Sequence, residues 1–296
     1  MVASRPPGDG NLVRRVAFAV VAIPVALLLV WYGGVPLALL LAVAGALAAR
    51  ELFDLAERGG VRPARVLGLA SALVVAPLTY ATIASSDVRG VIGAAWPYAA
   101  AVWLIVVMLW GLLARAPSDR PLEAVAVTVL GVAYTAGLPA FLLAIRHSGF
   151  ARRSWAGAWL VFFPLVVTWV VDTAAMFGGR AMGGPKLAPT VSPGKTRSGS
   201  IAGVMGGLIV APIFAAAVFP RVGLEIPLWQ LLAIAAILGV VGQAGDLAES
   251  LFKREAGVKD SSHLIPGHGG VLDRLDSLYF VVPAAAAMYR LFGIIR

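Results

Sequence analysis

The sequence predicts an all-α polytopic integral membrane protein with about nine transmembrane helices. Of its 296 residues, 60% are hydrophobic and only 13% are charged, whereas a soluble domain carries about a quarter charged residues. Apolar runs of about 20 residues, the length that a bilayer-crossing helix requires, recur along the whole chain. Cysteine is absent, which excludes both a disulfide framework and a cysteine-ligated metal site.

The expected spans are separated by short polar segments. Gly33 and Gly34 are the only break in the first long apolar stretch, so two helices are expected there. The stretch that follows Arg14 and Arg15 is too long for the hydrophobic region of a signal peptide, which indicates a retained first helix. The nine expected spans are 16–32, 35–55, 66–84, 91–114, 122–145, 158–179, 200–220, 228–252 and 271–294.

The charges between the spans indicate the orientation. A cytoplasmic N-terminus places most Lys and Arg residues on the inner side, as the positive-inside rule requires. Arg146, Arg152 and Arg153 lie on the outer side and are exceptions. Loop topology and anionic lipid head groups account for the net charge of +9, so no nucleic-acid partner is expected. The arginine- and alanine-rich composition is typical of a GC-rich bacterial genome, and the bacterial cytoplasmic (inner) membrane is the expected location.

Acidic residues change their placement in the second half of the chain. Asp172 lies about 14 residues into its expected span, a depth at which carboxylates are costly and usually functional. Asp246, Glu249, Ser250 and Lys253 follow the spacing i, i+3, i+4, i+7, so they share one helix face. Acids at the C-terminal end of a helix oppose its macrodipole. Either the neighbouring basic residues or a bound cation must therefore compensate them.

A second carboxylate pair stands at the start of the last span. Asp273 and Asp276 are three residues apart, and helix capping is one interpretation of them. Together with Asp246 they form an oxygen-only ligand set, which suits a hard cation such as Mg²⁺ bound jointly with substrate phosphates. Whether a second cation also binds is left open.

Basic and glycine residues near these acids favour phosphate binding. Gly267, Gly269 and Gly270 would let backbone N–H groups approach an anion, although glycines before a helix also form simple turns. His263 and His268 are candidate hydrogen-bond donors or acid–base groups. The basic candidates are Lys253, Arg254, Lys259 and Arg274.

The loop 180–199 contains a Gly-Lys-Thr sequence but no Walker A motif. That motif requires a glycine five residues before Gly194, where Pro189 stands, and no strand is expected before it. Two interpretations of this loop are left open: it supplies phosphate ligands, or it is only a basic cytoplasmic loop that sets the topology. The candidate phosphate ligands are Ser192, Lys195 and Thr196.

The segment 250–277 resembles the signature of the phosphatidate cytidylyltransferase, or CDP-diacylglycerol synthase, family. The matching residues are Ser250, Lys253-Arg254, Lys259-Asp260, His268-Gly269-Gly270, Asp273-Arg274 and Asp276. Two upstream blocks are also similar: Asp172, Thr173, Ala175, Gly179 and Arg180, and then Ser192, Pro193, Lys195, Thr196 and Gly199. Met176 and Arg197-Ser198 depart from the aromatic residue and the Trp-Glu pair that the family has. The resemblance is strong only over residues 165–295.

This resemblance implies transfer of CMP from CTP to phosphatidate, giving CDP-diacylglycerol and pyrophosphate, by a nucleotidyltransferase whose active site faces the cytoplasm. The expected partners are CTP, phosphatidate and membrane lipids, and a homodimer stays open. Asp246, Asp273 and Asp276 are the expected Mg²⁺ ligands and, with Lys259 and Arg274, the expected catalytic residues. The expected substrate-binding residues are Asp172, Ser192, Lys195, Thr196, Glu249, Ser250, Lys253, Arg254, Asp260, His268, Gly269 and Gly270.

The polar residues divide the chain into an N-terminal scaffold of about five spans, 1–157, and a catalytic region of about four spans, 158–296, within one continuous membrane domain. Two other functions fit these residues less well. CDP-alcohol phosphotransferases share the Asp-x-x-Asp spacing, but their longer motif is absent. An ion-coupled secondary transporter would carry midplane acids in two halves, whereas these acids gather in one half and near one membrane face.

Overall fold

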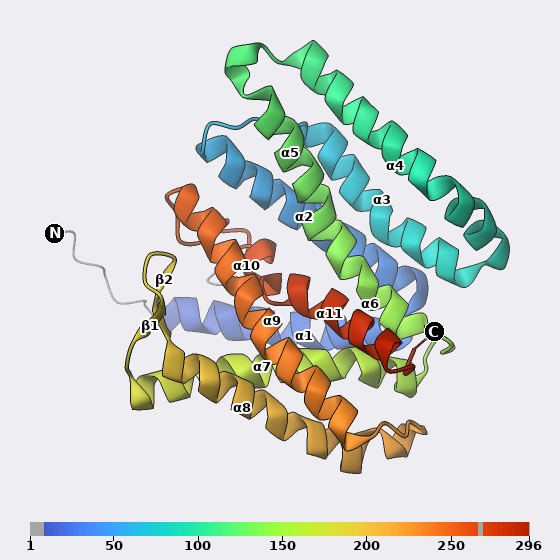
Figure 1. Ribbon diagram of the computed structural model, residues 1–296, viewed down its shortest axis with the longest axis vertical. Helices are drawn as coiled ribbons and strands as arrows, with labels where there is room; N and C mark the ends of the chain where they lie inside the picture. The colour runs from blue at the N-terminus through green and yellow to red at the C-terminus, as the bar shows by residue number, and fades with distance from the viewer. Residues whose placement is uncertain (1–8, 266–268, 296) are drawn as a thin grey trace.

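The computed structural model describes residues 9–265 and 269–295, and helices dominate them (Figure 1). Seven helical segments of this described part are long and apolar enough to cross a membrane by length and composition. The chain is therefore an all-α polytopic membrane protein, as the sequence predicts. Its longer helices are α1 (Asp9–Tyr32), α2 (Gly34–Arg58), α3 (Arg65–Ala84), α4 (Ser86–Ala114), α5 (Pro121–Val132), α6 (Leu138–His147), α7 (Trp155–Met182), α8 (Arg197–Ile213), α9 (Leu228–Glu255) and α11 (Leu278–Leu291).

Each of the nine expected spans coincides with helical structure. Seven of them match the long segments, and the first coincides with the apolar part of α1, Val20–Tyr32. The expected break at Gly33 is confirmed: α1 ends at Tyr32 and α2 begins at Gly34. Gly33 and Gly34 both have positive φ angles, of 68° and 66°, which glycine adopts without steric cost.

The last expected span is not one continuous helix. It is divided into α10 (Val271–Leu275) and α11, with the break at Asp276 and Ser277. Gly245 of α9 allows this break, because the Asp276 carbonyl oxygen lies only 2.9 Å from where a β-carbon of Gly245 would be. That carbonyl faces α9, and the Phe280 N–H, which would pair with it in a continuous helix, donates to the Ser277 carbonyl instead.

Two of the spans contain a π-helical turn close to a proline. Pro139 has no N–H, and just before it the helix opens into a π-helical turn, η2 (Ala133–Gly137), that joins α5 to α6. A second π-helical turn, η3 (Phe214–Val218), ends α8 shortly before Pro220. Two short 3₁₀ turns, η1 (Pro117–Asp119) and η4 (Pro220–Val222), also begin at prolines.

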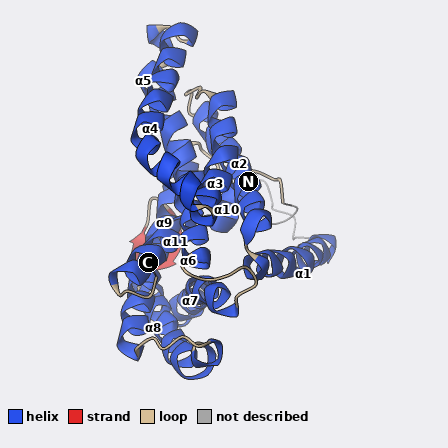
Figure 2. Cartoon of the chain, turned by 90° about the vertical axis from the view of Figure 1, so that its right-hand side faces the viewer, coloured by secondary structure: helices blue, strands red, loops and turns tan. Residues whose placement is uncertain are grey.

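The helices form two groups along the long axis of the molecule. Figure 1 shows α2, α3, α4 and α5 gathered at one end and α8 at the other, while α10 packs against α2. Helix α1 projects from one side of the bundle in Figure 2 and contacts α2 and α7. The main core lies among α7, α9 and α11, where the buried Tyr289 hydroxyl donates to the Leu160 carbonyl at 2.9 Å. α11 also packs against α6 and so joins the two groups.

Small residues bring α7 and α8 close together, as is common in membrane helix pairs. A β-carbon on Gly203 or Gly206 of α8 would press against Ala175 or Ala174 of α7. The segment between these helices forms an antiparallel hairpin, β1 (Lys186–Ala188) and β2 (Ser192–Thr196). The expectation of no strand here was wrong, because two short strands that pair only with each other leave no alternating apolar pattern in the sequence. The P-loop is still excluded by its spacing.

Two of the arginines that the predicted orientation leaves as exceptions have structural contacts. Arg146 is fully buried, and its guanidinium donates to the carbonyl oxygens of Val30 at 2.7 Å and Trp31 at 2.5 Å. It thereby satisfies carbonyls at the C-terminal end of α1, where positive charge is also favoured by the helix dipole. Arg153 lies over the Tyr32 ring at 4.8 Å. Packing therefore accounts for two of the three exceptions to the positive-inside pattern.

Candidate active site

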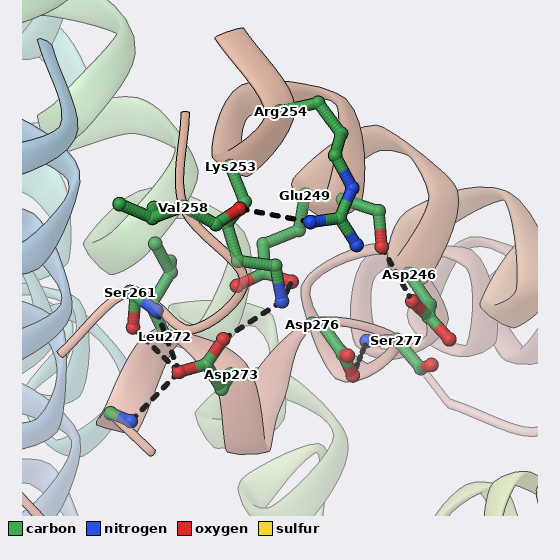
Figure 3. A network of polar contacts seen from close by, with 12 residues as sticks. Asp246, Glu249, Lys253, Arg254, Val258, Ser261, Leu272, Asp273, Asp276 and Ser277 are labelled. Carbon is green, nitrogen blue, oxygen red and sulfur yellow. Dashed lines mark hydrogen bonds and ion pairs between the residues drawn. The ribbon is translucent and has the colours of Figure 1, made fainter. Parts of the chain in front are cut away.

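The end of α9 carries the predicted polar face. Lys253 is buried, and its Nζ lies 2.6 Å from Glu249 Oε2 and 2.8 Å from Asp273 Oδ1 (Figure 3). The local pairing of Lys253 with Glu249, which the sequence left open, is therefore present. Glu249 is fully buried, and apart from this ion pair neither of its oxygens accepts a hydrogen bond in the described part of the chain.

Asp273 is the most completely coordinated acid of the signature segment. It is 6% exposed. Its Oδ2 accepts from the N–H of Ser261 at 2.9 Å, from the N–H of Gly270 at 2.8 Å and lies 2.9 Å from the Ser261 hydroxyl. Lys253 donates to its Oδ1. Since a carboxylate offers about four lone-pair positions, Oδ2 is filled and only Oδ1 has room for a further partner.

Glu51 is an acid of the site that the sequence does not predict. It lies near the C-terminal end of α2, yet it is only 2% exposed and contacts the signature segment more than 200 residues away. Its oxygens accept from the hydroxyls of Ser261 and Ser262 and from the N–H groups of Val271 and Leu272, at 2.8–3.0 Å. The sequence places Glu51 at a helix end, where acids are usually solvated, and nothing local distinguishes it.

A second group of charges lies in a cavity of about 660 Å³ between α7, the hairpin, α8 and α9. Lys195 of β2 reaches across to α9, where its Nζ is 2.5 Å from Asp246 Oδ2. The Ser250 hydroxyl donates to the other oxygen of Asp246 at 3.2 Å. Asp172 of α7 lines the same cavity and is exposed. The cavity therefore combines two carboxylates and an ammonium group from three separate elements.

Asp276 stands close to this second group. Its Oδ1 accepts from the neighbouring Ser277 N–H at 2.6 Å, and its charge acts on Asp172 together with that of Asp246. Figure 3 shows Asp276 next to Asp273 on the α10 segment and Asp246 on the facing helix. The charges of Asp246 and Lys195 both act on Asp172, and those of Asp246, Lys253 and Lys195 act on Asp276.

The other predicted residues have varied surroundings. Arg254 donates to the carbonyls of Val191 and Val258 at 3.1 and 3.0 Å, which ties α9 to the hairpin. The buried Thr196 hydroxyl caps α8 by accepting from the Gly199 N–H at 3.1 Å. Ser192 begins β2 and is half-buried. The exposed residues of this group are Arg254, Lys259, Asp260, His263 and Arg274.

Two positions of the signature require glycine for different structural reasons. Gly269 has a φ of +81°, a conformation that side-chain-bearing residues rarely adopt. Gly270 has an ordinary φ of −96°, but a β-carbon there would overlap the Glu51 carboxylate and the Ser261 hydroxyl. His268, also predicted to bind substrate, and Gly267 lie outside the described residues.

The expected metal ligands are not brought together as one cluster. Among the described residues, no group of three or more His, Cys, Asp or Glu side chains is arranged to hold a metal ion. Asp273 is bound by Lys253, Ser261 and Gly270, whereas Asp246 and Asp276 each keep oxygen capacity beside the cavity. The donor chemistry therefore fits a hard cation at Asp246 and Asp276 better than at Asp273.

Comparison with known proteins places the chain in a family. The model of the "Cytidylyltransferase family" matches residues 13–292, which includes α2 and the whole signature segment. The chain belongs to the cytidylyltransferase family. The resemblance found in the signature is confirmed, and the match extends the family membership to the first half of the chain.

Curated relatives of this cytidylyltransferase-family chain carry the name phosphatidate cytidylyltransferase. One from Brucella suis is 51% identical over 139 residues, which are 46% of this chain and 47% of the relative. One from Staphylococcus saprophyticus is 48% identical over 127 residues, 43% and 47% of the two chains. One from Haemophilus influenzae is 42% identical over 153 residues, 50% and 51%. The chain spans about half the length of the curated relatives it matches.

Proposed function

We propose that this cytidylyltransferase-family protein is a phosphatidate cytidylyltransferase, which converts CTP and phosphatidate to CDP-diacylglycerol and pyrophosphate. The observation that carries the proposal is the charged cavity at one end of a membrane-embedded bundle. There Lys195 and Asp246 meet from separate elements, beside the family signature. The name and high identity of the matched relatives support the same reaction.

The reaction needs positioning and charge neutralisation more than strong base catalysis. In the proposed step, a phosphate oxygen of phosphatidate attacks the α-phosphorus of CTP, and the bond to the β-phosphate oxygen breaks to release pyrophosphate. The attacking phosphate is already anionic near neutral pH, because the second pKa of a phosphomonoester is about 6. The main obstacle is bringing two polyanions together, which fixed cations reduce.

The basic residues divide into two sets by their accessibility. Lys259 and Arg274 are exposed and free to approach the triphosphate or the departing pyrophosphate. Lys195 already lies in the cavity, where it would pair with an incoming phosphate in place of Asp246. Lys253 is buried between Glu249 and Asp273, so its proposed role is to hold Asp273 rather than to bind the triphosphate directly.

Mg²⁺ is the proposed cofactor, held by Asp246 and Asp276 together with substrate phosphates. When bound, it would neutralise phosphate charge, and carboxylate oxygens are its preferred protein ligands. Asp273 would join through Oδ1 only if Lys253 shares that oxygen. Asp172, on the exposed flank of α7, would complete the acidic wall of the cavity.

Phosphatidate would enter from the bilayer. Asp172 and Met176 line the cavity and are both exposed on the side of α7, so the cavity is open there. The acyl chains would then stay in the membrane while the phosphate reaches Lys195. We further propose that this end of the bundle faces the cytoplasm of a bacterium, where CTP is available.

The test is incubation of the purified chain in detergent–lipid micelles with radiolabelled CTP, phosphatidate and Mg²⁺. The expected products are labelled CDP-diacylglycerol and pyrophosphate, in equal amounts. Omission of phosphatidate or Mg²⁺ should abolish both products. A folded preparation that forms neither product would overturn the proposal, and release of CMP from CDP-diacylglycerol with an alcohol acceptor would indicate a phosphotransferase instead.

A further inference from the structure

Glu51 is a buried carboxylate with four donors, and all four belong to the signature segment. Its Oε1 accepts from the Ser262 hydroxyl at 2.8 Å and the Val271 N–H at 3.0 Å. Its Oε2 accepts from the Ser261 hydroxyl at 2.9 Å and the Leu272 N–H at 2.8 Å. Burying a carboxylate is costly unless it is well hydrogen-bonded, and here the donors come from both sides of one loop.

The same donors connect Glu51 to Asp273. The Ser261 hydroxyl lies 2.9 Å from Asp273 Oδ2 as well as 2.9 Å from Glu51 Oε2. Having one proton, it donates to one carboxylate at a time, while the Ser261 N–H holds Asp273 throughout. Gly270 lies beside both carboxylates, without space for a side chain. The position of Asp273 thus depends on Glu51 through Ser261 and through the start of α10.

We propose that Glu51 is a positioning residue for the signature segment. By accepting from the first N–H groups of α10 and from Ser261, it sets where Asp273 stands relative to Lys253 on α9. It acts on the chemistry only through these residues and does not touch substrate. This inference rests on the proposed function, and it gives α2, which precedes the signature by some 200 residues, a direct part in the site.

The decisive variant is Glu51→Gln, which keeps the shape and removes one acceptor oxygen. A serine hydroxyl can turn to accept from the new NH₂ group, but a backbone N–H cannot. Either Val271 or Leu272 therefore loses its acceptor, whichever way the amide is placed. We expect faster hydrogen–deuterium exchange in peptides covering 269–275. We also expect kcat to fall by about 10- to 100-fold, the range seen when groups that orient catalytic ligands are removed, with the KM for phosphatidate little changed.

Two control variants separate positioning from general stability. Glu57→Gln removes an exposed carboxylate from the same helix and should change neither exchange nor kcat. Leu37→Ala opens a cavity in the main core at the far end of α2, so it should lower the thermal unfolding midpoint while kcat, measured well below that midpoint, is preserved.

Four outcomes would decide against the proposals. Unchanged exchange at 269–275 in Glu51→Gln overturns the positioning role, and so does a kcat equal to that of the unaltered protein. If Leu37→Ala and Glu51→Gln lower the unfolding midpoint equally and also lower kcat equally, the loss of activity is an effect of stability. That result also overturns the positioning role. If the unaltered protein transfers no label from CTP, the proposed function fails, while the exchange comparison still decides whether Glu51 holds the segment.

Discussion

Gly270 occupies the closest approach between Glu51, Ser261 and Asp273. Its N–H donates to Asp273 Oδ2 at 2.8 Å, and its φ of −96° is open to any residue. The requirement for glycine is therefore spatial: a β-carbon would overlap the Glu51 carboxylate and the Ser261 hydroxyl. At the neighbouring Gly269, by contrast, a φ of +81° makes backbone conformation part of the requirement.

Substituting Gly270 by Ala should destabilise the protein. The added methyl group must displace two hydrogen-bonded groups, and overpacking of this kind costs about 1–3 kcal/mol. We expect a lower thermal unfolding midpoint in detergent and a lower rate of CDP-diacylglycerol formation. Gly90→Ala is the matched control, because nothing lies within 4 Å of its new β-carbon. Equal midpoints for the two variants would contradict the close approach.

Asp273 is held by a buried ammonium and three further donor groups, so its charge has a defined function. In Asp273→Asn the side chain no longer balances Lys253, and an NH₂ group faces atoms that donate. We expect label transfer from CTP to lipid to fall by about 100-fold or more, the scale seen when a fixed electrostatic partner is lost. Asp87→Asn, in the first turn of α4, serves as the control. Near-normal turnover in a folded Asp273→Asn protein would remove Asp273 from the catalytic role.

At the scale of elements, the α7–α8 pair sets the width of the cavity. Glycines on α8 let its backbone approach the alanines of α7, and the hairpin that joins the two helices carries Lys195. The Thr196 hydroxyl, next in the chain, caps the first turn of α8. The spacing of α7 and α8, and with it the separation of Asp172 and Lys195, therefore depends on small uncharged residues of the two helices.

Widening this helix pair should impair the site without changing any charge. In Gly206→Leu, the new side chain must enter space that Ala174 already fills, so α8 has to move away from α7. The expected result is a lower unfolding midpoint together with a higher KM for CTP, because Lys195 moves with α8. Ile209→Leu, which faces outward on the same helix, should leave both values unchanged. A Gly206→Leu protein with unaltered KM would show that the spacing does not control the cavity.

At the scale of the whole molecule, the two halves of the chain are joined at the site. The division into a scaffold, 1–157, and a catalytic region, 158–296, stays a prediction. Glu51 crosses that boundary with four hydrogen bonds. At the opposite end of the bundle, Arg146 joins α6 to α1. In addition, α6 packs against α7 and α11, and α1 packs against α7, so the N-terminal helices contact the region 158–296 at several places.

The proposed orientation can be measured directly, because the chain has no cysteine of its own. Thr190→Cys places a thiol in the exposed turn of the hairpin, and Ala151→Cys places one in the exposed loop before α7. In intact spheroplasts, a membrane-impermeant maleimide should label Ala151→Cys only. In inverted membrane vesicles it should label Thr190→Cys only. The reverse pattern would place the charged cavity on the outer side and contradict the proposed supply of CTP.

The sequence by itself determined the membrane class, the positions of the helices and the family, and it predicted most of the charged residues of the candidate site. These properties are local: apolar runs reveal spans, and the signature residues keep fixed spacings along one segment. It also predicted that Asp246, Glu249, Ser250 and Lys253 share a helix face, because helical periodicity is a property of the backbone.

Only the tertiary structure decided which charges meet. It paired Lys195 with Asp246, enclosed Lys253 between Glu249 and Asp273, and divided the last span at Asp276. It also brought Glu51 of α2 to the start of α10, a contact for which the sequence offers no signal. Such contacts depend on how helices distant in the chain pack together. The residues beside Glu51 in the sequence therefore do not reveal that it is buried among four distant donors.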